Sequence, residues 1–308
     1  MNTNPAIPDP RLLFEAVRDS YGLRLALVFG NEAPSGVCPF YGKQGYHCDI
    51  GAGEGVRFDP SLNRERLDWF RRHYAALLPR VAHLVVYNSG SVLNPRELSD
   101  SSLQTILAFA ASLPECRVIS LDSREGFITT ARLDFVLGHL RPGQQLRPIL
   151  GLETQDENAR LEVLRKKMAR SAIEAVFRAL GRHAGRIGLD VNIVFAPPPF
   201  QGPAARAEAV ATANFALELS QPRQIPVDFN LHPYYPSQIG RQRFPDHPRA
   251  DLDAALETAR TIRALTARIG MESRVFIGWQ DEGHDQEPSL RSAELTRRRQ
   301  AFDHFNAA

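Results

Sequence analysis

The chain has 308 residues, of which 43% are hydrophobic and 23% charged, and both values are ordinary for a globular protein. Its net charge of +2 is too small to indicate a nucleic-acid partner. Three cysteines exclude a disulfide scaffold and suit a reducing compartment. The first residues lack the pattern of a signal peptide, and no apolar run reaches the roughly 18 residues of a membrane span. We therefore expect a cytoplasmic protein without a membrane partner.

Residues 1–20 are expected to form an extended segment, because Pro5, Pro8 and Pro10 disfavour a helix there. The run L-R-L-A-L-V-F at 23–29 then predicts a strand, and the periodicity of 64–78 predicts a helix. The same alternation continues along the chain. Further strands are predicted at 83–87, 117–121, 147–152, 191–195, 227–231 and 275–279, further helices at 103–113, 131–140, 160–182, 206–219 and 250–269, and a polar helix or tail at 281–308.

The predicted strands are mostly short apolar runs, which is typical of parallel strands covered on both faces. Alternating strands and helices indicate a parallel β/α sheet or barrel. With about six or seven repeats, we expect a partial TIM-like β/α barrel that occupies residues 21–280 as one domain. The site of such a barrel lies where the strands end. This rule selects residues 30–55, 88–97, 122–128, 153–157, 196–202 and 232–240.

Cys38 and Cys48 lie together in the loop after the first predicted strand, within C-P-F-Y-G-K-Q-G-Y-H-C-D-I-G-A-G-E-G. A loop of Cys, Gly and His is better suited to wrapping an inorganic centre than to filling a core. The alternatives are two free thiols in a surface loop, or a zinc site in which His47 is a third ligand and a fourth ligand is distant. No phosphate-binding G-x-x-x-x-G-K-[ST] or zinc-binding H-E-x-x-H motif occurs.

Polar residues also follow the other predicted strands. Ser89, Gly90 and Ser91 either present backbone N–H and hydroxyl groups to a ligand or form an ordinary turn. Arg124 is placed to bind a carboxylate with two hydrogen bonds or to form a salt bridge in the barrel rim.

Two further strand-end sites carry open alternatives. Glu153 either accepts hydrogen bonds from a ligand or pairs with a nearby Arg or Lys. His232 and Tyr235, with Tyr234, either line a substrate pocket or pack at the barrel mouth. The basic run at 165–170 is interpreted as a solvated helix face within 160–182.

Four of these segments together resemble the radical SAM superfamily, especially the branch that contains the catalytic subunit of elongator. The resemblance extends over about residues 20–240 and depends on the order of the four segments. They are Y-N-S-G-S-V-L-N-P-R-E-L at 87–98, I-S-L-D-S-R-E-G-F-I-T at 119–129, I-L-G-L-E-T-Q-D-E at 149–157 and V-F-A-P-P-P-F at 194–200.

The resemblance implies a 4Fe-4S iron–sulfur cluster and S-adenosylmethionine as cofactors, with an external electron donor. Family members bind the cluster through three cysteines of one loop, whereas this loop has Cys38 and Cys48, and the third position falls on Gly45 or Gly51. His47 or Asp49 could replace the missing thiolate, since ligation of iron–sulfur centres by residues other than cysteine occurs. Cys116 precedes a strand, so it is expected at the opposite end of the barrel.

The resemblance also implies the chemistry and the site residues. Such an enzyme cleaves S-adenosylmethionine to methionine and a 5′-deoxyadenosyl radical, which abstracts hydrogen from a substrate. Ser89, Gly90 and Ser91 would contact the methionine part, Arg124 its carboxylate and Glu153 the ribose. His232 and Tyr235 would contact the substrate, which is a small molecule or another unidentified compound.

Two alternative functions remain open from the sequence. The missing third cysteine favours a degenerate relative that has the same barrel without a cluster and acts as a binding or scaffold protein. The other alternative is a barrel hydrolase or lyase that uses zinc or no metal. Iron and sulfide content separates these alternatives from the radical SAM enzyme.

Overall fold

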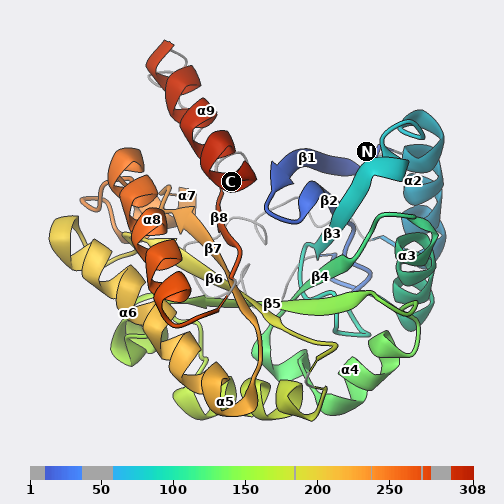
Figure 1. Ribbon diagram of the computed structural model, residues 1–308, viewed down its shortest axis with the longest axis horizontal. Helices are drawn as coiled ribbons and strands as arrows, with labels where there is room; N and C mark the ends of the chain where they lie inside the picture. The colour runs from blue at the N-terminus through green and yellow to red at the C-terminus, as the bar shows by residue number, and fades with distance from the viewer. Residues whose placement is uncertain (1–10, 37–57, 184, 237, 272, 279–292) are drawn as a thin grey trace, which may run out of the picture.

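The computed structural model describes residues 11–36, 58–183, 185–236, 238–271, 273–278 and 293–308. Within these residues eight strands form one curved sheet in the order of the sequence (Figure 1). The first two strands pair antiparallel, and all later pairs are parallel. The strands are β1 Leu13–Asp19, β2 Gly22–Phe29, β3 Val81–Asn88, β4 Val118–Ser123, β5 Gln145–Glu153, β6 Leu189–Phe195, β7 Val227–Pro233 and β8 Val275–Ile277.

The fold is therefore the expected partial β/α barrel, with seven parallel strands from β2 to β8. Helices lie outside the curved sheet (Figure 1). The six strands predicted between residues 23 and 231 are all present, with small shifts at the ends. Strand β8 lies within the range predicted at 275–279. The helices are α2 Pro60–His73, α3 Asp100–Ser112, α4 Thr130–Leu137, α5 Arg170–Leu180, α6 Gly202–Ser220, α7 Gln238–Arg243, α8 Leu252–Arg268 and α9 Ala293–Ala307.

Side-chain capping defines where several helices begin. The Asp59 side chain accepts a hydrogen bond from the Leu62 amide at the start of α2, and Ser99 and Thr129 cap α3 and α4 in the same way. An oxygen at this position satisfies an amide that has no partner within the helix, which contributes about 1 kcal/mol. The helices thus start just after the strand-end loops, and this leaves those loops at one edge of the barrel.

The two faces of the sheet have different compositions. The outward face contributes to the main hydrophobic core against the helices, with residues such as Leu25, Leu84 and Leu150 fully buried. The inward face has only a small separate apolar cluster of Ala26, Val85 and Ile149. Alternate residues of a strand share a face. The inward positions nearer to either end of the strands than this cluster are therefore the ones that carry polar side chains.

The predicted helix at 160–182 is wrong, because the segment is broken. A short π-helix covers Ala159–Val163, and α5 begins only at Arg170. Arg160 is buried between the two pieces, where its Nε donates to Met168 O at 2.7 Å and its Nη1 donates to Thr154 O at 2.8 Å. These bonds fold the chain between them into a loop.

The interpretation of residues 165–170 as a solvated helix face is therefore also wrong. Arg165 and Lys167 have positive φ angles of 53° and 54°, which no helix allows. Lys166 between them is buried, with 4% of its surface exposed. The break thus turns one lysine of a basic run into the interior.

The C-terminal end of helix α9 lies beside the two edge strands of the sheet, β1 and β8 (Figure 1). Asn306 bonds to the free edge of β8: its Oδ1 accepts from Ile277 N at 2.8 Å, and its Nδ2 donates to Ile277 O at 3.1 Å. Phe302 and Phe305 of the same helix are buried in the core. The residues after 292 thus cover an exposed strand edge. No helix in the described part of the chain has both the length and the apolar character needed to cross a membrane.

Candidate functional site

The loop with the predicted metal ligands Cys38, His47 and Cys48 lies outside the described residues, as do Gly45, Asp49 and Gly51. The start of this loop is described, and it is fixed to the helices behind it. Asn63 of α2 accepts from Gly30 N at 2.9 Å and donates to Gly30 O at 3.1 Å. The Glu32 carboxylate accepts from Ser99 N at 2.8 Å.

Cys116 is the free cysteine of the described residues, and it is fully buried. Its thiol donates to Val118 O at 3.5 Å, and burial raises its pKa to about 11. Cys116 precedes β4, which puts it at the end of the barrel opposite to the strand-end loops. Among the described residues, no group of three or more His, Cys, Asp or Glu side chains is arranged to hold a metal ion.

The Ser89–Gly90–Ser91 turn after β3 is bonded to a carboxylate of the same chain. Ser91 N donates to Glu97 Oε2 at 2.6 Å, and Asn94 Nδ2 donates to Glu97 Oε1 at 2.7 Å. A Cβ atom at Gly90 would lie 2.0 Å from Glu97 Oε2, so glycine is needed for this approach. Glu97 is buried, and burial raises its pKa. The sequence pattern gave no indication of Glu97.

Glu153 ends β5 in the left-handed region, with φ 66°, next to an irregularity in strand pairing. Its Oε1 accepts from Lys166 Nζ at 2.5 Å, and the same ammonium donates to Gly151 O. A Cβ at Gly151 would lie 2.8 Å from Glu153 Oε1 and 2.9 Å from Lys166 Nζ, so the pair fills the space over this glycine. Strained non-glycine backbone of this kind is concentrated at functional sites.

Asp122, near the end of β4, is half-buried on the inward face. Burial raises its pKa to about 7, attraction from Lys166 opposes this rise, and repulsion from Glu153 adds to it. Charges on His232 and Glu97 also act on it, so these groups surround it. Within the described part of the chain, no hydrogen bond or ion pair reaches its carboxyl group. A perturbed carboxyl at a strand end is a typical feature of a functional site.

Arg124 links three of the strand-end segments. Its backbone N donates to Ser91 Oγ at 3.3 Å, and its Nη2 donates to Glu125 Oε1 at 3.2 Å and to Lys166 O at 3.3 Å. The salt bridge within the rim that the sequence left open is thus present.

His232 and Tyr235 are half-buried at and after the end of β7. Tyr234 between them is buried against the ring of His247, with ring centroids 5.2 Å apart. The guanidinium of Arg241 lies 5.8 Å from the Tyr235 ring centroid. His232 lies close enough to Asp122 for its charge to lower the pKa of that carboxyl group. Tyr234, in contrast, packs in the protein interior. We call Glu97, Asp122, Arg124, Glu153, Lys166 and His232 the edge cluster.

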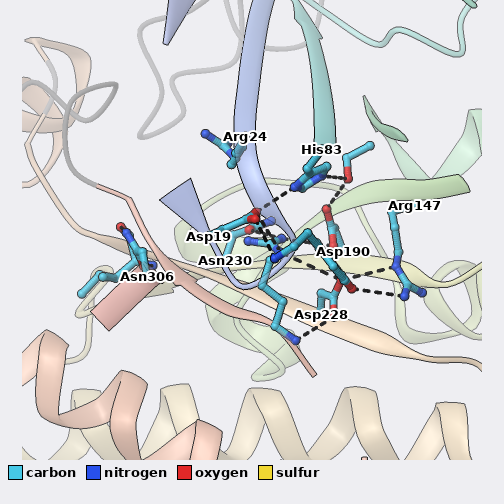
Figure 2. Close-up of polar contacts among 12 residues, drawn as sticks. Asp19, Arg24, His83, Arg147, Asp190, Asp228, Asn230 and Asn306 are labelled. Atoms are coloured by element: carbon cyan, nitrogen blue, oxygen red, sulfur yellow. Dashed lines mark hydrogen bonds and ion pairs between the residues drawn. The ribbon is translucent and has the colours of Figure 1, made fainter. Parts of the chain in front are cut away.

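A second polar group occupies the inward face at the other end of the strands (Figure 2). His83 is central to it: Nδ1 lies 2.7 Å from Asp19 Oδ2, and Nε2 lies 2.8 Å from Ser120 Oγ. We call this group the basal network, and its members are Asp19, Tyr21, His83, Ser120, Arg147, Asp190, Asp228 and Arg274.

Asp19, His83 and Ser120 have the order of contacts of a catalytic Ser–His–Asp triad. Ser120 is nevertheless fully buried, and its hydroxyl donates to Asp190 Oδ2 at 2.7 Å. A nucleophilic serine needs access to a substrate and must give its proton to the histidine. Ser120 meets neither condition, so these contacts are structural.

Ion pairs complete the basal network. Arg274 Nη2 lies 3.2 Å from Asp190 Oδ1, and Arg147 Nε lies 3.3 Å from Asp228 Oδ2. Burial alone would raise the pKa of Asp19, but His83 and Arg274 lower it to about 2. Asp19 belongs to β1 and Arg274 immediately precedes β8, so the network joins the two edges of the open sheet.

Comparison with solved structures shows what this fold is similar to. The chain is 12% identical to Streptococcus suis SuiB, with a TM-score of 0.50 over 89% of this chain and 54% of SuiB. For SuiB bound to the precursor peptide SuiA the identity is 14% and the TM-score 0.50, over 91% of this chain and 55% of that chain. The archaeal Methanocaldococcus infernus Elp3 with an N-terminal deletion gives 13% and 0.43, over 72% and 52%.

The chain thus spans about half the length of these proteins. No protein-family model and no curated protein sequence matches it. At this level of identity the likeness is one of fold. The two SuiB structures confirm the expected partial β/α barrel.

Proposed function

We propose that the chain is a radical SAM enzyme that binds S-adenosylmethionine at the edge cluster. The observation that carries the proposal is the Glu153–Lys166 pair beside Asp122, whose carboxyl group no hydrogen bond or ion pair reaches among the described residues, with Glu153 on left-handed backbone at the end of β5. Sites of β/α barrels lie at this edge. The left-handed backbone at Glu153 supports this placement, because strain of this kind is concentrated at functional sites.

The donor set suits the ligand. S-adenosylmethionine has an ammonium, a carboxylate and two ribose hydroxyls, and the edge cluster has both carboxylates and cations. Glu153 would accept from the ribose hydroxyls, and Arg124 would bind the ligand carboxylate. Ser89, Gly90 and Ser91 would border the methionine part, where the Glu97 carboxylate already occupies the Ser91 amide.

Cys38, Cys48 and His47 are the proposed ligands of an iron–sulfur cluster. When bound, the cluster and S-adenosylmethionine supply a radical that abstracts hydrogen, with the electron coming from an external donor. The chain's own part is to fix the ligand. Lys166 holds Glu153 in one orientation, and second-layer support of this kind keeps a site in its working geometry.

Asp122 is able to take up or release a proton near neutral pH, because its pKa is raised to about 7. His232 and Tyr235 would contact the substrate at the same end of the barrel. One SuiB structure contains a precursor peptide, so a peptide is a substrate class to test beside small molecules.

Anaerobic reconstitution with iron and sulfide tests the cluster. We expect about four irons per chain and an EPR signal on reduction, both lost in Cys48→Ala and retained in Cys116→Ala. Cys116 is buried at the other end of the barrel, which makes it the matched control. Absence of iron in the unaltered protein would contradict the cluster assignment and favour a barrel that binds ligands without redox chemistry.

Calorimetric titration with S-adenosylmethionine tests the edge cluster separately. Glu153→Gln is expected to lower the affinity at least about tenfold, because a hydrogen bond to a charged group contributes roughly 1.5–3 kcal/mol. Glu162→Gln is the matched control, since Glu162 is exposed in the short π-helix that follows β5. Equal affinities of the two variants would remove Glu153 from the proposed site.

A further inference from the structure

A groove between α6 and α8 is separate from the edge cluster. It has a volume of about 710 Å³ and is mostly lined by apolar groups, among them Val210, Ala250 and Ala254. It also borders Ala196, which follows β6, so it opens at the same end of the barrel as the edge cluster. The proposed cofactor site uses none of Val210, Ala250 and Ala254.

The shape of the groove indicates an elongated ligand. Its wall on α8 extends from Asp251 to Thr261, a separation of ten residues that corresponds to about 15 Å of helix. An extended peptide of about four or five residues has this length. On α6 the lining residues Pro203, Arg206 and Val210 recur at helical spacing, so one stripe of that helix forms the opposite wall.

The charges at the rim indicate the sign of the ligand. Arg206 and Arg249 line the groove from opposite sides and are exposed, and no carboxylate of the described residues pairs with either. The carboxylate of Asp251, which also lines the groove, already caps α8: its Oδ1 accepts from Asp253 N at 2.9 Å and from Ala254 N at 3.1 Å. Two exposed cations beside an apolar floor therefore complement a ligand in which acidic groups alternate with apolar ones.

His247 makes the end of the groove rigid. Its Nε2 donates to Ala196 O at 3.0 Å, and its Nδ1 accepts from Gln201 Nε2 at 3.3 Å. Its ring also packs against buried Tyr234. The groove is thus largely preformed, which lowers the entropy cost of binding.

We propose that the groove between α6 and α8 docks a peptide segment in which acidic and apolar side chains alternate. The apolar side chains would enter the groove between Val210 and Ala254, and the carboxylates would face Arg206 and Arg249. The site lies outside the barrel, so it does not depend on a cluster or on S-adenosylmethionine.

Fluorescence anisotropy with the full chain tests this proposal. The probe is a short labelled peptide of alternating glutamate and leucine, compared with a glutamine–leucine and a glutamate–serine peptide. We expect the first to bind and both comparison peptides to bind at least about fivefold more weakly, as each loses one of the two complementary features. Failure of the glutamate–leucine peptide to bind would overturn the proposal, and so would binding of dodecanoate in its place.

Variants locate the binding. Ala207→Trp introduces a bulky ring at an exposed groove residue and is expected to abolish binding without unfolding the protein. Arg206→Glu and Arg249→Glu should each weaken binding about fivefold, whereas Arg268→Glu, an equal charge change on α8 away from the groove, should not. An equal loss in Arg268→Glu would mean diffuse attraction and would overturn the site, as would unaltered binding in Ala207→Trp. Circular dichroism and Tm confirm that each variant is folded.

Discussion

The two ends of the barrel interior are both polar, but their charges are paired differently. In the basal network each carboxylate of Asp19, Asp190 and Asp228 lies within 4.0 Å of an arginine or histidine nitrogen. In the edge cluster Asp122 has no such partner among the described residues, and Glu153 is held on strained backbone. The paired end is built for stability, and the incompletely paired end has capacity left for a ligand.

Removing a central cation of the basal network should have the largest effect. Arg274 is 4% exposed and lies near Asp19, Asp190 and Asp228. Arg274→Met is expected to lower the free energy of unfolding by about 3–5 kcal/mol, because it removes the ion pair of the buried Asp190 carboxylate and takes a cation away from Asp19 and Asp228. Urea denaturation measures this. Arg268→Met, at an exposed position of α8, should stay within about 0.5 kcal/mol, and a similar loss there would contradict the comparison.

Acid should weaken the basal network through Asp19. Its pKa is about 2 in the folded protein against an ordinary 3.8, so its stabilisation is present above about pH 4 and lost as the pH falls toward 2. We expect Asp19→Asn to be more destabilising near pH 6 than near pH 2, by about 2 kcal/mol. Urea denaturation across this pH range measures it. A difference that is the same at both pH values would contradict the pairing of Asp19.

Asp122 should behave with the opposite sign and a smaller effect. Its folded pKa of about 7 lies above the ordinary 3.8, so folding is penalised as the pH rises from about 4 to 7, and the penalty persists above 7. Asp122→Asn is thus expected to stabilise the protein near pH 8 and to have little effect near pH 4. The full difference in pKa corresponds to roughly 4 kcal/mol, and solvent screening at this half-buried site reduces the gain to about 1–2 kcal/mol. Loss of stability near pH 8 would mean that Asp122 is paired like the basal carboxylates.

The sequence predicted the strands because each is a short, mostly apolar run. It did not predict the basal network. Asp190 and Asp228 stand at the starts of β6 and β7, where single polar residues look like strand ends, and only closure of the sheet brings them together. Contacts between residues so distant along the chain have no local pattern.

The edge cluster was predicted in part. Arg124, Glu153 and His232 lie after the ends of predicted strands, and sites of β/α barrels are expected at such positions. Lys166 was missed because the basic run around it has helical composition, and the break depends on the buried contacts of Arg160. Asp122 and Glu97 lie within the selected segments 122–128 and 88–97, but neither was singled out, because the charge of a residue and its place in the chain do not reveal its partners.

The bonding of Asn306 to β8 has a consequence for the solubility of the folding chain. Until α9 packs, the Ile277 backbone at the edge of β8 lacks both hydrogen bonds to Asn306. An open strand edge pairs readily with other chains. Docking of α9 therefore also protects the barrel from edge-to-edge aggregation.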